Sequence, residues 1–203
     1  MAHVDLVRKE VSAKIVYYGP KLSGKTKNLE SICAYSPEQT AQKVTPISTE
    51  EDQNLFYEFM PIDLGIMNGL RTRLQLYTVP GQIQYNNTRM LVLQNVDGII
   101  FVADSQEERL KENQLSFKNL EENLRKYAVD LTNLSLLFQY NKRDLPNVLS
   151  VELLNETLNH WGYPFIEVVA SQGIGVLPTL KMITNSIFEG IQKNRGTTRY
   201  FIR

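Results

Sequence analysis

The sequence predicts an α/β fold, in which a mostly parallel sheet of six to seven strands has helices on both faces and one antiparallel hairpin at its edge. Three observations lead to this prediction. Short β-rich apolar segments alternate along the chain with segments of helical periodicity, which is the order found in βαβ units. Segments 97–105 and 134–141 are almost continuously apolar, as is typical of strands covered on both faces. Segment 71–79 alternates polar and apolar residues, which indicates a half-buried strand.

The first half of the chain contains three expected strands and one expected helix. Residues 13–18 (AKIVYY) form a short β-rich segment, and a glycine-containing loop separates it from a helix expected at 25–35. Segments 55–63 and 71–79 flank an Asn-Gly pair at 68–69, which favours a tight turn. We therefore expect these two segments to pair as an antiparallel hairpin.

The second half of the chain repeats the order of strand and helix. The strand at 97–105 precedes a long amphipathic helix, and a strand at 134–141, a helix at 151–159 and a short strand at 165–170 follow. The apolar face of the long helix contains Leu110, Phe117, Leu120, Leu124 and Tyr127. The apolar face of the last helix contains Val176, Leu180, Ile183, Ile187 and Ile191.

We expect a single domain over residues 1–203, because the length suits one domain and no repeat or linker interrupts the chain. Hydrophobic residues make up 42% of the sequence, which is enough for a substantial core. The expected domain has a short N-terminal extension at 1–10 and a C-terminal tail at 195–203. The tail ends in TRYFIR, which could contact a partner or a membrane surface, or could simply fray.

Charge and cysteine content exclude several classes of protein. Lysine and arginine total 22, as do aspartate and glutamate, and this balance does not favour a nucleic-acid polymer as partner. The single cysteine, Cys33, excludes a disulfide within the chain and fits a reducing compartment, where it is more simply a packed residue than a reactive thiol. No apolar run approaches the length of a transmembrane helix. We expect a soluble cytoplasmic protein that reaches a membrane or a cell pole only through a partner or a surface patch.

A phosphate-binding loop is predicted between the first long strand and the first helix. Residues 19–26 match G-x-x-x-x-G-K-[ST] in the strand–loop–helix context that this motif requires. Backbone N–H groups and the helix N-terminus attract phosphate in such loops. Lys25 can reach the β- and γ-phosphates, and the Thr26 hydroxyl can bind Mg²⁺. The candidate phosphate-binding residues are Gly19, Pro20, Lys21, Leu22, Ser23, Gly24, Lys25 and Thr26.

A guanine-binding loop is predicted after the strand at 134–141. Asn141, Lys142 and Asp144 match N-K-x-D. The Asp144 carboxylate can accept hydrogen bonds from N1–H and the exocyclic amine of guanine, whereas adenine offers neither donor and would be rejected. Asn141 would support the loop, and the Lys142 stem would lie over the base. Ala170 and Ser171 could bring a backbone N–H to the guanine oxygen, although an ordinary strand-to-helix loop explains them equally well.

Five segments of the chain resemble the MglA family of bacterial Ras-like small GTPases over about residues 11–193. They are KIVYYGPKLSGKT, LYTVPGQ, DGIIFVADS, QYNKRDLPN and GVLPTLK. The resemblance implies a Ras-like P-loop GTPase domain that binds GTP or GDP with Mg²⁺ and switches conformation between the two states. It also implies an MglB-like roadblock-domain dimer as activator, and effectors in cell polarity or in gliding or twitching motility.

The resemblance also implies a second switch region over TVPGQ. Thr78 occupies the position where most GTPases have aspartate, and threonine there is typical of the MglA family. Pro80 and Gly81 follow, and the Gly81 N–H could contact the γ-phosphate. Gln82 matches the glutamine that orients the attacking water. With Lys25, it is the candidate catalytic residue, unless it is an ordinary surface glutamine.

The first switch region departs from the family pattern T-E-x-x-R-T-L-F-F-D-F. Thr49 matches its first position, but Gln53 stands at the family arginine, which is thought to act as an intrinsic arginine finger. Glutamine cannot neutralise the developing phosphoryl charge, and an arginine finger contributes roughly 10³–10⁵ in rate. Asn54 stands at the following threonine, where its amide oxygen is a poorer candidate ligand for Mg²⁺ than a hydroxyl.

Lys21 is a third departure, because the family usually has glycine at this position. Its side chain could block the approach of Gln82 to the γ-phosphate, supply a positive charge to the phosphates, or point into solvent. We therefore expect slow GTP hydrolysis, unless these changes are neutral. The alternative is a non-hydrolysing scaffold that holds GTP or GDP and competes for MglA partners. An adenine-nucleotide enzyme is disfavoured by Asp144.

Overall fold

The computed structural model describes residues 3–5, 8–36, 44–49, 52–67, 69–131 and 134–198. Its strands form one eight-stranded sheet in the order β3-β4-β5-β2-β6-β7-β8, and β1 pairs with β2 outside this path. The strands are β1 His3–Asp5, β2 Glu10–Tyr18, β3 Thr45–Thr49, β4 Asp52–Met67, β5 Leu70–Thr78, β6 Gly98–Asp104, β7 Ser135–Asn141 and β8 Phe165–Glu167.

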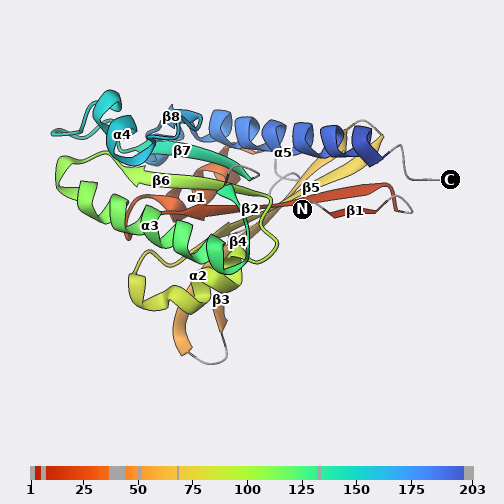
Figure 1. Ribbon diagram of the computed structural model, residues 1–203, viewed down its shortest axis with the longest axis horizontal. Helices are drawn as coiled ribbons and strands as arrows, with labels where there is room; N and C mark the ends of the chain where they lie inside the picture. The colour runs from red at the N-terminus through yellow and green to blue at the C-terminus, as the bar shows by residue number, and fades with distance from the viewer. Residues whose placement is uncertain are drawn as a thin grey trace.

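Helices cover both faces of this sheet (Figure 1). They are α1 Lys25–Tyr35, α2 Asn86–Leu93, α3 Leu110–Lys126, α4 Val151–Leu158 and α5 Val176–Thr198, with short 3₁₀ helices η1 Ile83–Tyr85, η2 Glu107–Arg109 and η4 Ala170–Gln172. α1 and α5 pack on one face, whereas α2, α3 and α4 pack on the other. The predicted α/β fold is confirmed. Among the described helices, none has the length and apolar character needed to cross a membrane.

β2 lies in the centre of the sheet and contributes side chains to both hydrophobic cores. Ala13, Ile15 and Tyr17 pack towards α1 and α5, while Val16 and Tyr18 pack towards α2 and α3. β2 is parallel to both of its neighbours in the central path, β5 and β6. Their carboxyl ends therefore meet at one edge of the sheet, which is where open α/β sheets bind ligands.

The antiparallel hairpin predicted around residues 68–69 is present. β4 and β5 pair antiparallel up to Met67 opposite Leu70, so the connection is two residues long. Gly69 has a φ of 80°, a conformation that glycine adopts without steric cost. Asn68, the other residue of the predicted turn, lies outside the described residues.

Three features differ from the sequence-based expectations. The short strands β1 and β3 bring the sheet to eight strands, and β1 lies within the segment expected to be an N-terminal extension. β8 covers only Phe165–Glu167 of the strand expected at 165–170. α5 continues to Thr198, into the expected tail, of which residues 199–203 lie outside the described part. Strands of three to five residues have little periodicity of their own and depend on their pairing partners.

Candidate functional site

The loop at residues 19–24 joins β2 to α1 and surrounds the side chain of Lys25. This side chain is buried, and its amine donates hydrogen bonds to the carbonyl oxygens of Gly19 at 3.0 Å and Pro20 at 2.7 Å. Ser23 is also buried, whereas Leu22 is 73% exposed and has a φ of 64°. Because α1 begins at Lys25, the positive end of its dipole faces the same loop.

The electrostatics of this loop suit an anion. Burial and, to a smaller extent, the positive charge of Arg89 lower the pKa of the Lys25 amine to about 7, while Glu58 opposes the shift. A phosphate group beside the amine would favour its charged form and restore a higher pKa. The buried amine and the helix N-terminus therefore form a site that fits nucleotide phosphates.

Asn141, at the end of β7, connects two of the predicted binding loops. Its side-chain amide donates to the Ser23 carbonyl at 2.7 Å, and its side-chain oxygen accepts the Ala170 N–H at 2.9 Å. Asn141 is buried and lies so close to Gly24 that a Cβ on this glycine would collide with the Asn141 amide. Gly24 also has a φ of 103°, which glycine adopts readily. The phosphate loop and the predicted guanine loop are thus held together through one side chain.

Lys142 is positioned by a buried carboxylate. Its amine lies 2.5 Å from Oδ2 of Asp104, which is fully buried at the end of β6. Arg109 approaches the same carboxylate oxygen at 3.9 Å through Nε and donates through Nη2 to the Lys21 carbonyl at 2.9 Å. The structure therefore anchors the ammonium of Lys142, while the position of its stem over a base remains a prediction.

The other predicted guanine-binding residues lie around the same end of the sheet. Asp144 is exposed, and Nε2 of Gln172 lies 3.5 Å from its Oδ2. Ala170 and Ser171 begin η4, where Ala170 is buried and Ser171 is exposed. The Ala170 N–H already donates to Asn141, so a hydrogen bond from it to the guanine oxygen would have to be shared with that bond. Contact of these two residues with guanine remains a prediction.

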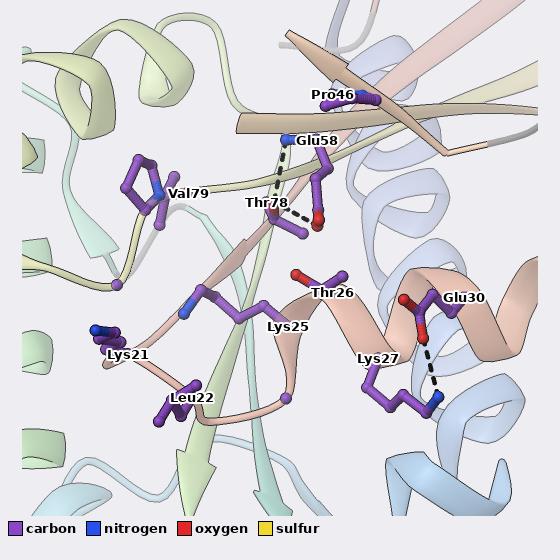
Figure 2. Close-up of a pocket in the computed structure, with 13 residues that line it drawn as sticks. Lys21, Leu22, Lys25, Thr26, Lys27, Glu30, Pro46, Glu58, Thr78 and Val79 are labelled. Atoms are coloured by element: carbon purple, nitrogen blue, oxygen red, sulfur yellow. Dashed lines mark hydrogen bonds and ion pairs between the residues drawn. The ribbon is translucent and has the colours of Figure 1, made fainter. Parts of the chain in front are cut away.

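A pocket of about 550 Å³ opens beside the phosphate loop (Figure 2). It brings together the phosphate loop, the start of α1, the β3–β4 strands and the end of β5. The described residues that line it are Lys21, Leu22, Gly24, Lys25, Thr26, Lys27, Glu30, Pro46, Glu58, Thr78, Val79, Pro80 and Gly81. Most of the phosphate-loop residues, and Thr78, Pro80 and Gly81 of the second switch, were predicted separately from the sequence and share this pocket.

Glu58 is a site residue that the sequence did not identify. Figure 2 shows its carboxylate and the Thr26 hydroxyl pointing into the same pocket. Thr78 donates to this carboxylate at 3.0 Å, and its oxygen accepts the Glu58 backbone N–H at 3.1 Å. A hydroxyl and a carboxylate are oxygen ligands of the type that Mg²⁺ prefers, so the donor set fits this ion. Two signals in the sequence could have found it: an acidic residue stands within the otherwise mostly apolar run LFYEFM, and the family pattern of the first switch region has aspartate at the same position.

The second switch region packs directly against the phosphate loop. A Cβ on Gly81 would collide with the backbone of Lys21 and Pro20, so glycine is required for this approach. Gln82 follows, immediately before η1 begins at Ile83, and is partly buried. It is not among the described residues that line the pocket, so its predicted catalytic role has no direct geometric support in this conformation.

Arg89 on α2 holds the second switch region in place, and sequence analysis missed it. Its guanidinium is fully buried and donates to the carbonyl oxygens of Pro80 at 2.8 Å and Gly81 at 2.5 Å. It also donates to Oδ1 of Asn119 at 2.8 Å and lies over the ring of Tyr18. Nothing in the local sequence distinguishes this arginine from those on exposed helix faces.

The predicted residues of the first switch region are described by their backbone. The backbone of Thr49 lies in β3 and that of Gln53 and Asn54 in β4. The side chains of all three lie outside the described part of the chain. The predicted Mg²⁺ ligand Asn54 and the substituted finger position Gln53 therefore remain sequence-based predictions.

Comparison with known proteins agrees with this geometry. Residues 3–194 match the family model described as the ADP-ribosylation factor family. The mutual gliding-motility protein MglA of Myxococcus xanthus (strain DK1622) is 44% identical over 193 residues, which are 95% of this chain and 99% of that protein. Both similarities span the phosphate loop, the second switch and the N-K-x-D loop. The chain therefore belongs to the MglA family of small GTPases.

Proposed function

We propose that this protein is a guanine-nucleotide switch that binds GTP and GDP with Mg²⁺ and regulates cell polarity or gliding or twitching motility. The observation that carries the binding proposal is the position of Asn141. It ties the Ser23 carbonyl to the Ala170 N–H, which holds the two segments close together, and we infer that they share one ligand. The motility role rests on the relative from Myxococcus xanthus, whose name states that activity.

Each subsite has residues of suitable chemistry. Phosphates would contact the loop from Gly19 to Thr26, and the buried amine of Lys25 would face them. The guanine edge would pair with Asp144. Thr26 and Glu58 would hold Mg²⁺, with Asn54 as the candidate ligand from the first switch. When bound, Mg²⁺ neutralises phosphate charge in this class of site.

Slow hydrolysis is part of the proposal. Gly81 packs against the Lys21 backbone, so the Lys21 side chain leaves the loop at the point where the second switch approaches it. We infer that a side chain leaving the loop at this point obstructs the path by which Gln82 would reach the attacking water. Gln53 cannot replace the charge of an arginine finger.

A single-turnover GTP time course tests the proposal, with and without a roadblock-domain dimer of the MglB type. We expect GTP binding with slow cleavage, and faster cleavage when the dimer is added. Rapid turnover by the protein alone would refute the slow-hydrolysis proposal. Tight ATP binding without GTP binding would refute the guanine assignment.

The contact between Gly81 and Lys21 also supports a second candidate, a non-hydrolysing scaffold that competes for MglA partners. The same time course separates the two. Intact GTP after prolonged incubation, with or without the roadblock dimer, would favour the scaffold. Measurable cleavage that the dimer accelerates would exclude it.

A further inference from the structure

A chain of buried polar groups crosses the protein interior beneath the phosphate loop. Asn28 on α1 and Gln139 on β7 form a reciprocal pair of amide hydrogen bonds, at 2.7 Å from Asn28 Nδ2 to Gln139 Oε1 and 2.9 Å from Gln139 Nε2 to Asn28 Oδ1. Both residues are fully buried. Gln139 lies in a strand whose neighbouring side chains belong to the two hydrophobic cores.

One end of this chain reaches the phosphate loop, and the other reaches the short segment between η4, which contains Ala170 and Ser171, and α5. At one end, Asn28 Nδ2 also lies 3.0 Å from the carbonyl oxygen of Gly24, in the phosphate loop. At the other end, Gln139 Nε2 donates to the Thr179 hydroxyl at 3.2 Å. That hydroxyl donates in turn to the carbonyl oxygen of Gly175 at 2.6 Å, in the loop that follows η4 and leads into α5. An unbroken path therefore links the phosphate loop to the segment that follows the predicted guanine contacts Ala170 and Ser171.

Stability alone is a poor reason to place these groups in the core. Burying amides and hydroxyls costs free energy that hydrogen bonds only offset, and apolar side chains of similar size would fill the space without that cost. Hydrogen bonds are directional, so a fully satisfied polar network selects a single arrangement of the elements that it joins. Apolar packing does not fix the arrangement in this way.

We propose that the chain Asn28–Gln139–Thr179 is a positioning device. It holds the phosphate loop and the segment from η4 to α5, where the predicted guanine contacts Ala170 and Ser171 lie, at the separation that one guanine nucleotide spans. The inference rests on the proposed guanine-nucleotide site. It acts in parallel with Asn141, which is also buried and joins Ser23 in the phosphate loop to Ala170 in η4. A second tie runs from the Ser31 hydroxyl to the Ala170 carbonyl at 2.6 Å.

Thr179→Val tests the proposal, because valine keeps the shape of threonine but cannot bond to Gln139 or Gly175. We expect GDP to dissociate about tenfold faster, since a buried amide loses its partner. Pyrophosphate, which occupies the phosphate loop alone, should bind within about twofold of wild type, because the phosphate loop keeps its own bonds. Thr179→Ser retains the hydroxyl and should restore the wild-type rate.

Thr184→Val is the matched control on the same helix. Thr184 is also buried, but its hydroxyl donates only to the Leu180 carbonyl within α5, at 2.6 Å. We expect this variant to lower the thermal midpoint of the nucleotide-free protein as Thr179→Val does, without faster GDP release. Gln139→Met breaks the chain at its centre and provides a second variant, which should reproduce the faster GDP release.

The outcomes separate the two proposals. If the wild-type protein binds neither GDP nor pyrophosphate, the proposed function fails and the positioning proposal fails with it. If wild type binds GDP but Thr179→Val and Gln139→Met release it at the wild-type rate, only the positioning proposal is wrong. Equal weakening of GDP and pyrophosphate would also overturn it, because the chain would then support the phosphate loop alone.

Discussion

Thr78 and Glu58 are joined by two hydrogen bonds, one from the Thr78 hydroxyl to the Glu58 carboxylate at 3.0 Å and one from the Glu58 backbone N–H to the Thr78 oxygen at 3.1 Å. The pair places a negative charge in the pocket that also contains the Thr26 hydroxyl (Figure 2). Threonine carries no charge of its own at the position where most GTPases have aspartate. Its hydroxyl instead orients a carboxylate that the neighbouring strand supplies.

Glu58→Gln should therefore weaken Mg²⁺ binding and raise the Mg²⁺ concentration that is needed to retain the nucleotide. The substitution keeps the size of the side chain but removes its charge, and we expect half-maximal slowing of GDP release to need about tenfold more Mg²⁺. A magnesium titration of the GDP dissociation rate measures this. Thr78→Ser, which keeps the orienting hydroxyl, is the control and should behave like wild type. An unchanged titration curve for Glu58→Gln would show that Glu58 does not contribute to Mg²⁺ binding.

Lys21→Gly should accelerate GTP hydrolysis. Gly81 packs on the Lys21 backbone, and removal of the side chain opens the path of the second switch to the phosphates. Misplacement of a catalytic group by about 1 Å can cost about 10²-fold, so we expect a gain of up to about that size in single-turnover cleavage. Leu22→Gly is the matched control, because Leu22 is the adjacent loop residue and is 73% exposed. Equal gains in both variants would indicate loosening of the loop instead.

Asp144→Asn should change the base that the protein prefers. Loss of the carboxylate removes charge-assisted hydrogen bonds to guanine, and we expect GDP affinity to fall about 10²-fold. Xanthine has a carbonyl in place of the exocyclic amine, so the asparagine amide can pair with it and xanthosine diphosphate should bind more tightly than GDP. Competition binding measures both affinities. Glu156→Gln, an exposed carboxylate on α4, should leave them unchanged.

Binding of GDP should take up a proton at pH 8. The pKa of Lys25 is lowered to about 7, so about nine-tenths of these amines are neutral at pH 8, and a bound phosphate restores the charge. At pH 6 the amine is already protonated and uptake should be small. Calorimetry in buffers of different ionisation enthalpy measures the uptake. Lys25→Arg, which stays charged at both pH values, should show none.

The same pKa shift predicts how the stability of the nucleotide-free protein depends on pH. Between about pH 7 and the ordinary lysine pKa of 10.5, the unfolded chain binds more protons at Lys25 than the folded chain does. The contribution of Lys25 to the free energy of unfolding therefore rises with pH across this window. Urea unfolding of the wild type and of Lys25→Met at several pH values isolates this contribution.

Arg89→Leu should destabilise the protein and release the second switch region. The substitution leaves the carbonyl oxygens of Pro80 and Gly81 without their buried donors, which we expect to cost about 2–5 kcal/mol in the free energy of unfolding. Arg89→Lys, which keeps the charge and part of the bonding, should lose less. Urea unfolding measures both, with Arg125→Leu on the exposed face of α3 as control. A loss equal to that of Arg125→Leu would contradict the bonding role.

The elements with strong local patterns were predicted well, and the short ones were not. α1 begins and ends where its sequence indicates, at Lys25 and Tyr35, because a glycine loop precedes it and its periodicity is local. β6 is buried along its whole length, as its continuous apolar sequence predicts. β1 and β3 exist through their pairing with β2 and β4, and nothing within three to five residues reveals a partner elsewhere in the chain.

The sequence alone determined the family and the two loops of the candidate site, because short contiguous motifs such as Gly19–Thr26 and Asn141–Asp144 carry their chemistry in local spacing. Tertiary structure alone decided which distant residues complete the site. Glu58 reaches Thr78 only because β4 and β5 pair with Phe59 opposite Tyr77, and Arg89 reaches Gly81 only because α2 packs against the sheet. Register and packing are properties of the whole fold, so no local pattern records them.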